Sequence, residues 1–273
     1  MTDSLRTITI RDLATLEEYL ECCEIQDETW GRGFSERVPA AILRVSQKIG
    51  GVTAGAFDAD GRMIGFVFGL TGLRDGRPAH WSDMLAVREE ARGHHIGDQL
   101  KHYQRERVRE LGVDLMLWTY DPLVARNAHF NFNRLGAFPV EYVENMYGDN
   151  TGSTLHGALP TDRFVIGWNL SNAERHETAI ATPQDGDEEI PMANPLDDGG
   201  LPVLALPDIA PAFRVQIPHE MSAIQNTGPL AATRWRLTVR DAMISLYNRG
   251  FSATRFVRGA PGRLPYYVVT LRA

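Results

Sequence analysis

The sequence predicts a mixed α/β protein with two structured regions, and three observations support this. Strand-like and helix-like patterns alternate from residue 5 to residue 170. A shorter β-α-β-β pattern follows residue 201. Between them, residues 172–200 are rich in Asp, Glu, Pro and Gly and show no periodicity, which is typical of a surface connection. We therefore expect a first domain over residues 1–171, an acidic linker over 172–200 and a C-terminal region over 201–273.

The first domain is expected to begin with a strand and two helices, followed by a hairpin. Two apolar runs between residues 52 and 72 are joined by Asp58-Ala59-Asp60-Gly61, a turn sequence. The run DLMLWTY does not alternate, as expected for a strand that is buried on both faces. In order, the expected elements are a strand at 7–12, helices at 13–30 and 39–49, the hairpin at 52–72, a strand at 80–87, a helix at 96–112, a strand at 114–120, a helix at 122–135 that ends before Gly136, and strands near 137–147 and 163–170.

The C-terminal region is expected to form one strand, one long helix and a closing hairpin. The strand covers residues 213–218, the helix covers 230–249 and stops at Gly250, and the hairpin joins 251–258 to 265–272. Such a small unit buries little apolar surface alone, so we expect it to pack on the first domain.

Composition narrows the class of protein. The net charge is −7, and residues 172–200 alone carry −7, so the remainder is neutral and no basic face for nucleic acid is predicted. The two cysteines, Cys22 and Cys23, are adjacent and cannot easily bridge, which favours a reducing compartment. The start lacks a signal-peptide pattern, and no apolar run approaches the ~20 residues of a membrane helix. We expect a cytoplasmic protein without nucleic-acid or membrane partners, with a homodimer left open.

The stretch VREEARGHHIG, residues 87–97, joins an expected strand to an expected helix. A diphosphate is bound where several backbone N–H groups converge at a helix N-terminus, because the helix dipole favours an anion there. Gly93 and Gly97 permit a close approach to the backbone, and Arg92 adds a positive charge. A plain strand-to-helix loop with two glycines explains the same residues.

The surroundings of this turn resemble the GNAT family of acyl-CoA N-acyltransferases. Its central motif is an Arg or Gln, two residues, Gly, one residue, and Gly or Ala, which corresponds here to Arg92 through Gly97 with His95 at the first glycine. The pieces WTYDPL (118–123), RNAHFN (126–131) and LPTDRF (159–164) resemble a bacterial subgroup with an appended C-terminal region. The resemblance implies a mostly antiparallel sheet with two splayed parallel strands. Some members of this subgroup resemble amino-acid N-acyltransferases, including succinyltransferases.

The resemblance further implies that acetyl-CoA or another acyl-CoA is the co-substrate. Its pantetheine arm would lie between strands 80–87 and 114–120, where Leu85 and Val87 offer backbone groups and Asn127 contacts the arm. We expect His95 to keep a negative φ, as in the first turn of a helix, and so to offer its N–H like the others. The residues expected at the diphosphate are Arg92, Gly93, His94, His95, Ile96 and Gly97.

Deprotonating the acceptor amine requires a base, and two residues are candidates. Asp83 lies where the family often places a glutamate base, while His80 has an ordinary pKa better suited to the task. Three residues apart on a strand, the two side chains face opposite sides unless the strand bulges. The family's tyrosine acid corresponds to Phe132, which has no proton to give; Tyr120 or Tyr147 would substitute, or the thiolate leaves unassisted.

Three further residues are candidates for substrate contacts. Asp121 and Arg126 suit the ammonium and the carboxylate of an amino acid, although an ion pair between the two residues is the simpler explanation of both. Trp30 would line the acyl pocket or simply pack. The sequence thus predicts an N-acyltransferase that moves an acetyl or succinyl group to a small amine by direct attack in a ternary complex, with no metal. The alternative, a catalytically silent CoA-binding module, is favoured by His95 and Phe132.

Overall fold

The computed structural model of the chain describes residues 7–148, 151–153, 159–171 and 182–272, which divide into two compact units. The first unit runs from Met1 to Trp118 and includes residues 150–157 and 169–172. The second contains residues 119–149, 158–168 and 173–273. The division therefore falls inside the strand at residue 118 rather than at the predicted residue 171, because the C-terminal region shares its core with residues 119–168.

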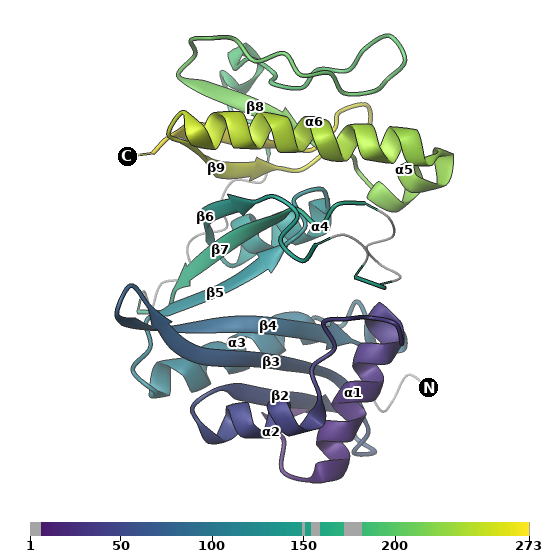
Figure 1. The fold of residues 1–273 in the computed structure, drawn as a ribbon, viewed down its shortest axis with the longest axis vertical. Helices are drawn as coiled ribbons and strands as arrows, with labels where there is room; N and C mark the ends of the chain where they lie inside the picture. The colour runs from purple at the N-terminus through teal and green to yellow at the C-terminus, as the bar shows by residue number, and fades with distance from the viewer. Residues whose placement is uncertain (1–6, 149–150, 154–158, 172–181, 273) are drawn as a thin grey trace. The chain divides into compact units, whose positions relative to one another are not determined.

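The first unit is a sheet with helices on both faces (Figure 1). Helices α1 and α2 lie on one face of strands β2 to β4, and α3 lies on the other. Strands β1 to β4 are consecutive antiparallel neighbours, and β5 joins β4 in parallel. The elements are β1 (Thr9–Asp12), α1 (Leu16–Trp30), α2 (Ala40–Lys48), β2 (Val52–Phe57), β3 (Met63–Arg74), β4 (Arg77–Val87), the 3-10 helix η2 (Glu89–Ala91), α3 (Ile96–Glu110) and β5 (Leu115–Tyr120), which continues into the second unit.

Local sequence signals explain where these elements begin and turn. Helix α1 begins after Thr15, whose hydroxyl accepts from the Glu18 N–H while the Glu18 carboxylate accepts from the Thr15 N–H, a capping box. The hairpin of β2 and β3 turns at Asp58, whose carboxylate accepts from the N–H groups of Asp60 and Arg62. Both predictions of element type at these positions are confirmed.

Strand β4 contains a bulge at Asp83. Phe68 pairs with Met84 while the next residue of β3, Gly69, pairs with Ser82, so Asp83 has no partner in β3. An extra residue reverses the alternation of side chains along the rest of the strand. As a result Ser82 hydrogen-bonds to α3, whereas Met84 belongs to the apolar core beneath α1 and α2. The bulge that the sequence left open is present.

The second unit contains the remaining strands and helices. Strands β6 and β7 are antiparallel, and the full strand order of the larger sheet is β1-β2-β3-β4-β5-β7-β6. The predicted β-α-β-β pattern is confirmed as a three-stranded antiparallel sheet in the order β8-β10-β9, with one further helix, α5. The elements are α4 (Ala125–Ala128), the π-helix η3 (His129–Arg134), β6 (Phe138–Val143), β7 (Arg163–Asn169), the 3-10 helix η4 (Asp187–Glu189), β8 (Ala212–Gln216), α5 (Met221–Thr227), α6 (Pro229–Asn248), β9 (Phe251–Val257) and β10 (Tyr266–Leu271). The mixed, mostly antiparallel sheet with one parallel pair and flanking helices is the fold class that the sequence predicts.

The C-terminal sheet packs against residues 119–168 within the second unit. The Tyr267 hydroxyl donates to the Pro122 carbonyl at 2.8 Å, and the Asn133 amide donates to the Phe256 carbonyl at 3.1 Å. The Tyr267 ring also lies 5.4 Å from that of Phe164. These buried contacts make the C-terminal region a structural part of the second unit.

The described part of the predicted acidic linker, residues 182–200, is mostly exposed but is tied to the second unit at Asp187, Ala193 and Asn194, which are buried. Asp187 is 3% exposed and accepts hydrogen bonds from Arg255 and, at 3.0 Å, from the Tyr266 hydroxyl. The Asn194 side chain exchanges hydrogen bonds with the backbone of Gln216. The expectation of a solvated segment holds for most of these residues and fails at Asp187 and Asn194, because composition alone does not reveal a buried partner. Residues 172–181 lie outside the described residues.

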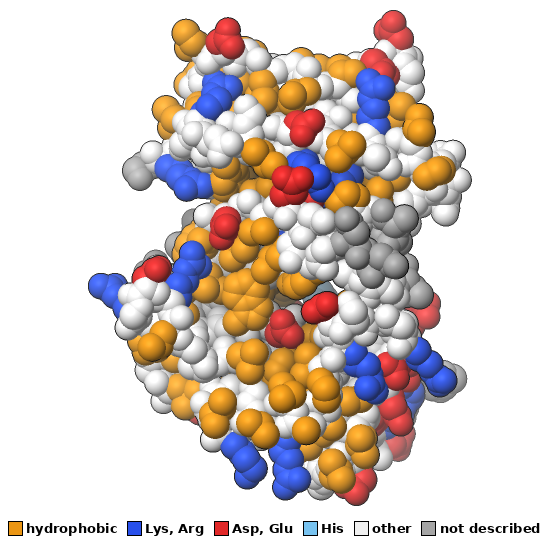
Figure 2. All heavy atoms as spheres, viewed as in Figure 1, with side chains coloured by type: hydrophobic (Ala, Val, Ile, Leu, Met, Phe, Trp, Pro, Cys, Tyr) orange, Lys and Arg blue, Asp and Glu red, His pale blue; other side chains and the backbone are white. Residues whose placement is uncertain are grey.

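The surface of the first unit mixes apolar and charged side chains. Figure 2 shows hydrophobic side chains over the face on which α1 and α2 lie, and exposed residues of these helices include Leu16, Leu20, Ile42 and Val45. Among the described residues, no helix combines the length and apolar character needed to cross a membrane.

Candidate functional site

The turn between β4 and α3 is held in an unusual backbone conformation. Gly93 has φ +87°, and His95, the N-cap of α3, has φ +58° and ψ +19°. The expectation of a negative φ at His95 is wrong. A left-handed residue here redirects the chain from the turn into the helix, and a Cβ makes that conformation costly for any residue but glycine. His95 therefore occupies a glycine-like position under strain.

The same turn leaves backbone donors free at the start of a 15-residue helix. The Gln99 N–H makes the first intrahelical bond, to the His95 carbonyl. Across the described residues, no acceptor is recorded for the N–H groups that precede it in the turn, those of Gly93, His94, His95, Ile96 and Gly97. Buried Ile96 anchors the helix, while the side chains of residues 92–95 are exposed. Free donors and the positive end of the helix dipole together favour an anion at this point.

Gly97 brings the first turn of α3 close to β4. A Cβ added to Gly97 would lie 3.4 Å from Leu85 Cδ2, so a side chain here fits only against the strand. The Arg92 guanidinium donates through Nε to the Val87 carbonyl at 3.3 Å and ties the turn to the end of β4. Arg92 stays exposed and adds a positive charge beside the free donors.

Strand β4 has an open edge beyond its first residues. Within the described residues, β4 and β5 pair at His80–Met116 and Trp81–Leu117. On the other edge, the Arg88 N–H donates to the Ile64 carbonyl of β3, so by alternation the backbone groups of Leu85 and Val87 point away from β3. The Val87 carbonyl already accepts from Arg92, and the role of the other groups as partners of a pantetheine arm stays a prediction.

Asp83, the bulged residue, lies just beyond the last paired residues of β4 and β5. Its side chain is exposed, yet the surrounding protein desolvates the carboxylate and raises its pKa. The negative charge of Glu36 also raises this pKa, whereas the hydrogen bond from the Trp81 indole N–H lowers it in part. A raised pKa brings a carboxyl group closer to the range in which it can exchange a proton with an amine. Asp83 remains the candidate base.

His80 does not fit the role of base. It is fully buried, and burial, with a contribution from Lys101, lowers its pKa to about 3. Because the Thr71 hydroxyl donates to the Gly50 carbonyl, it accepts from His80 Nδ1 at 2.9 Å. The other ring nitrogen then accepts from the Gln104 amide at 3.1 Å. The proposal of His80 as base is therefore wrong, since the neutral ring has both nitrogens in hydrogen bonds inside the protein.

A series of buried, hydrogen-bonded polar side chains next to the bulge was not predicted from the sequence. Lys101 Nζ donates to the Ser82 hydroxyl at 2.7 Å, and Ser82 donates to Gln104 Oε1 at 2.7 Å. Gln104 in turn donates to His80, so each group of the series donates to the next. The series fixes β4 against α3 on the side of the bulge. One sequence signal was available: the protein has two lysines, Lys48 and Lys101, against 26 arginines.

The two candidate acids differ in accessibility. Tyr120 is 5% exposed, and its hydroxyl donates to that of Tyr267 at 3.2 Å because the latter is committed to the Pro122 carbonyl. Burial raises the pKa of Tyr120 well above its usual value, so the expectation that it supplies a proton to a thiolate is wrong. Tyr147 is half-buried and shares a hydrogen bond of 2.8 Å with Thr119, and it stays a candidate.

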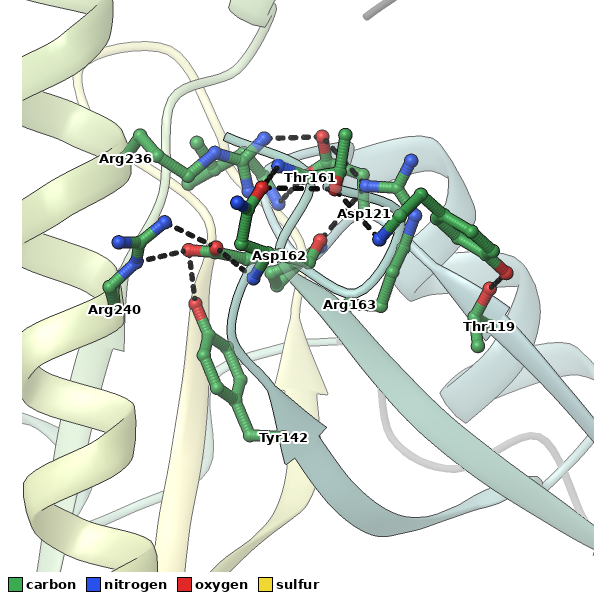
Figure 3. A network of polar contacts seen from close by, with 12 residues as sticks. Thr119, Asp121, Tyr142, Thr161, Asp162, Arg163, Arg236 and Arg240 are labelled. Carbon is green, nitrogen blue, oxygen red and sulfur yellow. Dashed lines mark hydrogen bonds and ion pairs between the residues drawn. The ribbon is translucent and has the colours of Figure 1, made fainter. Parts of the chain in front are cut away.

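Asp121 belongs to an ion network within the second unit (Figure 3). Its carboxylate pairs with Arg236 of α6, and Arg163 Nη1 lies 3.8 Å away. Burial alone would raise the pKa of Asp121, but the two guanidinium groups outweigh it and hold that pKa below its usual value. Arg126 is exposed and forms no recorded contact with Asp121 among the described residues. Asp121 therefore does not pair with Arg126, and its carboxylate is occupied by arginines of the protein rather than open to a substrate ammonium.

A second carboxylate of this network joins the same helix. Asp162 is fully buried and accepts two hydrogen bonds from Arg240, at 2.9 and 2.6 Å, and one from the Tyr142 hydroxyl at 3.0 Å. Figure 3 shows Arg236 and Arg240 extending from α6 toward Asp121 and Asp162. The arginines of α6 were missed because no sequence pattern links a helix to loops about a hundred residues earlier.

The remaining candidates have structural surroundings. Trp30 stacks on Phe34, with ring centroids 5.7 Å apart, and packs against the core of the first unit. Asn127, in the second unit, follows the turn after β5, and its N–H donates to the Val124 carbonyl; its side-chain role stays a prediction. Over the described ranges, no cluster of His, Cys, Asp and Glu is arranged to hold a metal ion.

Comparison with known proteins gives matches among solved structures. No family model matches the sequence, and no curated protein matches it. An acetyltransferase of the GNAT family from Streptococcus pneumoniae is similar at 15% identity, with 60% of this chain and 99% of that chain covered and a TM-score of 0.47. The ribosomal-protein-S18-alanine N-acetyltransferase of Escherichia coli is similar at 15% identity, with 62% of this chain and 98% of that chain covered and a TM-score of 0.47. PaiA N-acetyltransferase from Thermoplasma acidophilum, in complex with coenzyme A, is similar at 17% identity, with 60% of this chain and 99% of that chain covered and a TM-score of 0.43.

The structures that this chain resembles are acetyltransferases. With identities below 25% and TM-scores below 0.5, the activity of this chain has to be inferred from its own residues.

Proposed function

We propose that the chain is an acyl-CoA-dependent N-acyltransferase of the GNAT superfamily, acting on the amine of a small metabolite. The observation that carries the proposal is the turn before α3, where consecutive N–H groups without recorded acceptors meet the N-terminus of a 15-residue helix beside the open edge of β4. A diphosphate carries the charge that such a donor cluster favours. The motif from Arg92 to Gly97 supports coenzyme A as its source.

The residues of the first unit suit the remaining tasks of acyl transfer. A bound thioester supplies an activated acyl group with a good leaving group. The backbone groups of Leu85 and Val87 would hold its pantetheine arm along the open edge of β4. Asp83, at the bulge, would take the proton of the attacking ammonium, directly or through water. Tyr147, which belongs to the second unit, stays a candidate for the acid that protonates the departing thiolate, and the proposed reaction uses no metal.

The identities of the acyl group and of the acceptor are part of the proposal. The acyl group is acetyl or succinyl, and the acceptor is an amino acid or similar metabolite, as the resemblance to amino-acid N-acyltransferases suggests. Asn127 is retained as a contact to the cofactor arm and Trp30 as a wall of the acyl pocket. A cytoplasmic location and a homodimer remain predictions from the sequence.

Substitution of Gly97 tests the cofactor site. Gly97→Glu places a carboxylate at the first turn of α3, and we expect the Kd for coenzyme A to rise at least a hundredfold in calorimetry. Gly97→Gln has nearly the same shape without the charge and is the matched control, expected to weaken binding less than tenfold. Equal losses in the two variants would point to crowding against Leu85, and unchanged affinity in Gly97→Glu would remove the site from this turn.

Turnover separates the enzyme from a silent CoA-binding module. Acetyl-CoA and succinyl-CoA are each offered with a panel of amino acids and amines, and thiol release is followed. We expect release with at least one pair. Coenzyme A binding without turnover of any pair would support the silent module, which the absence of a hydroxyl at Phe132 favours.

A further inference from the structure

Lys101 occupies an uncommon place for a lysine. It is 3% exposed, on the second turn of α3, in a chain that carries arginine at nearly all its basic positions. Its Nζ lies 2.7 Å from the Ser82 hydroxyl and 3.8 Å from the centroid of the Trp118 ring. Among the described residues, no carboxylate is recorded in contact with it. Buried lysines are normally paired, so an unpaired one requires an explanation.

The two contacts place this amine where β4 and β5 part. Trp81 and Leu117 are the last paired residues of the two strands, and Ser82 and Trp118 are the residues that follow them. Lys101 reaches from α3 and touches both. Its Nζ therefore lies at the fork of the parallel pair, one residue before the bulged Asp83. All of these residues belong to the first unit.

An ammonium group at this fork needs an anion. A buried charge without a counter-charge is strongly unfavourable, and burial lowers the pKa of Lys101 well below its usual value. The polar groups that face it offer no negative charge: Ser82 is a hydroxyl, Gln104 an amide, and His80 a neutral imidazole. The free protein therefore favours a neutral amine, and a carboxylate brought to the fork would restore the ammonium by uptake of one proton from solvent.

We propose that Lys101 is a specificity-determining residue that selects acyl groups ending in a carboxylate. This inference rests on the proposed function, because it needs the thioester to lie along the open edge of β4 with its acyl group toward the fork. The acyl carboxylate would then form a buried ion pair with the protonated lysine over Trp118. A neutral acyl chain would leave the Lys101 amine without a counter-charge, so Lys101 would not contribute to its binding.

Two thioesters of equal chain length test the proposal. Butyryl-CoA and succinyl-CoA both carry four acyl carbons and differ in the terminal carboxylate. In calorimetry, we expect the native protein to bind succinyl-CoA at least tenfold more tightly than butyryl-CoA. In Lys101→Met this preference should disappear while the Kd for coenzyme A itself stays within about twofold, which also shows that the variant is folded. Lys48→Met removes the exposed lysine and should retain the full preference.

The charge of Lys101 can be read directly, since two lysines give two side-chain 15N signals. In the protein with 15N-labelled lysine, we expect the Lys101 signal to move from the neutral-amine to the ammonium position with succinyl-CoA and to stay neutral with butyryl-CoA. A preference for succinyl-CoA that survives in Lys101→Met would overturn the proposal, as would a Lys101 signal that succinyl-CoA leaves unchanged. Native protein that binds coenzyme A but does not distinguish the two thioesters would overturn it and spare the proposed function. Failure to bind coenzyme A at all would overturn both.

Discussion

Replacing Asp121 by alanine removes the carboxylate shared by Arg236 and Arg163. The side chains of these arginines are 3% and 6% exposed, and Nε and Nη1 of Arg236 have no recorded hydrogen-bond partner among the described residues. Breaking a buried pair in this way costs about 3–5 kcal/mol. We expect the lower end, about 3 kcal/mol, because the Asp121 side chain is 22% exposed and water can partly replace it.

Thermal unfolding followed by circular dichroism measures this loss. For a chain of this size, about 3 kcal/mol lowers the Tm by on the order of 6–12 °C. The matched control is Glu188→Ala, which breaks the pair of Glu188 with Arg263 at 2.6 Å, whose side chains are 74% and 51% exposed. Such a surface pair contributes at most about 0.5 kcal/mol. Equal small shifts in the two variants would refute the reasoning, and an unchanged Tm with a raised KM for the amine would return Asp121 to the substrate site.

The pH dependence of this loss has a definite sign. The arginines hold the pKa of Asp121 below its usual value in the folded protein. A depressed folded-state pKa contributes stability that is complete above the unfolded value of about 4 and is lost as pH falls through the folded-state value. The Tm difference between native protein and Asp121→Ala should therefore be full at pH 7 and shrink below about pH 4. A difference that grows on acidification would contradict the pairing.

Four other substitutions in the first unit have expected outcomes. His95→Gly should raise the free energy of unfolding by about 0.5–1 kcal/mol, the strain of a left-handed residue less the greater chain entropy of glycine. Gly93→Ala, at φ +87° in open space, should lower it by about 1 kcal/mol, and the opposite order in urea unfolding would show that the turn is not strained. Asp83→Asn should lower kcat at least a hundredfold with the Kd for coenzyme A unchanged; full activity would place the base elsewhere. His80→Gln should destabilise the fold and leave the pH-rate profile in place, because the buried ring is neutral throughout, so a displaced profile would restore His80 as a base.

The elements of this fold were largely predictable because each is specified locally. The capping box at Thr15, the turn at Asp58 and the strand-turn-helix around Gly93 are written in residues that are neighbours in the chain. The π-helical turn over His129–Arg134 was not, since one additional residue per turn leaves the apolar pattern of a short helix nearly unchanged.

The candidate site was only partly predictable, for a related reason. The donors of the turn belong to one stretch of chain, and the sequence identified them. The bulge at Asp83 depends on the register between β3 and β4, which decides that His80 and Ser82 turn inward toward α3. Arg236, the hydrogen-bonded partner of Asp121, comes from a helix more than a hundred residues later. Long-range pairing of this kind has no local signature, so the sequence suggested only a substrate contact or an ion pair with Arg126 for Asp121.

The most direct test of the central claim is a backbone 15N–1H titration of the protein with coenzyme A. We expect the largest amide shifts at Gly93, His95, Ile96 and Gly97, and inorganic pyrophosphate should shift the same amides at higher concentration. Saturable binding of coenzyme A that leaves these amides unmoved, with the largest shifts elsewhere in the chain, would contradict it.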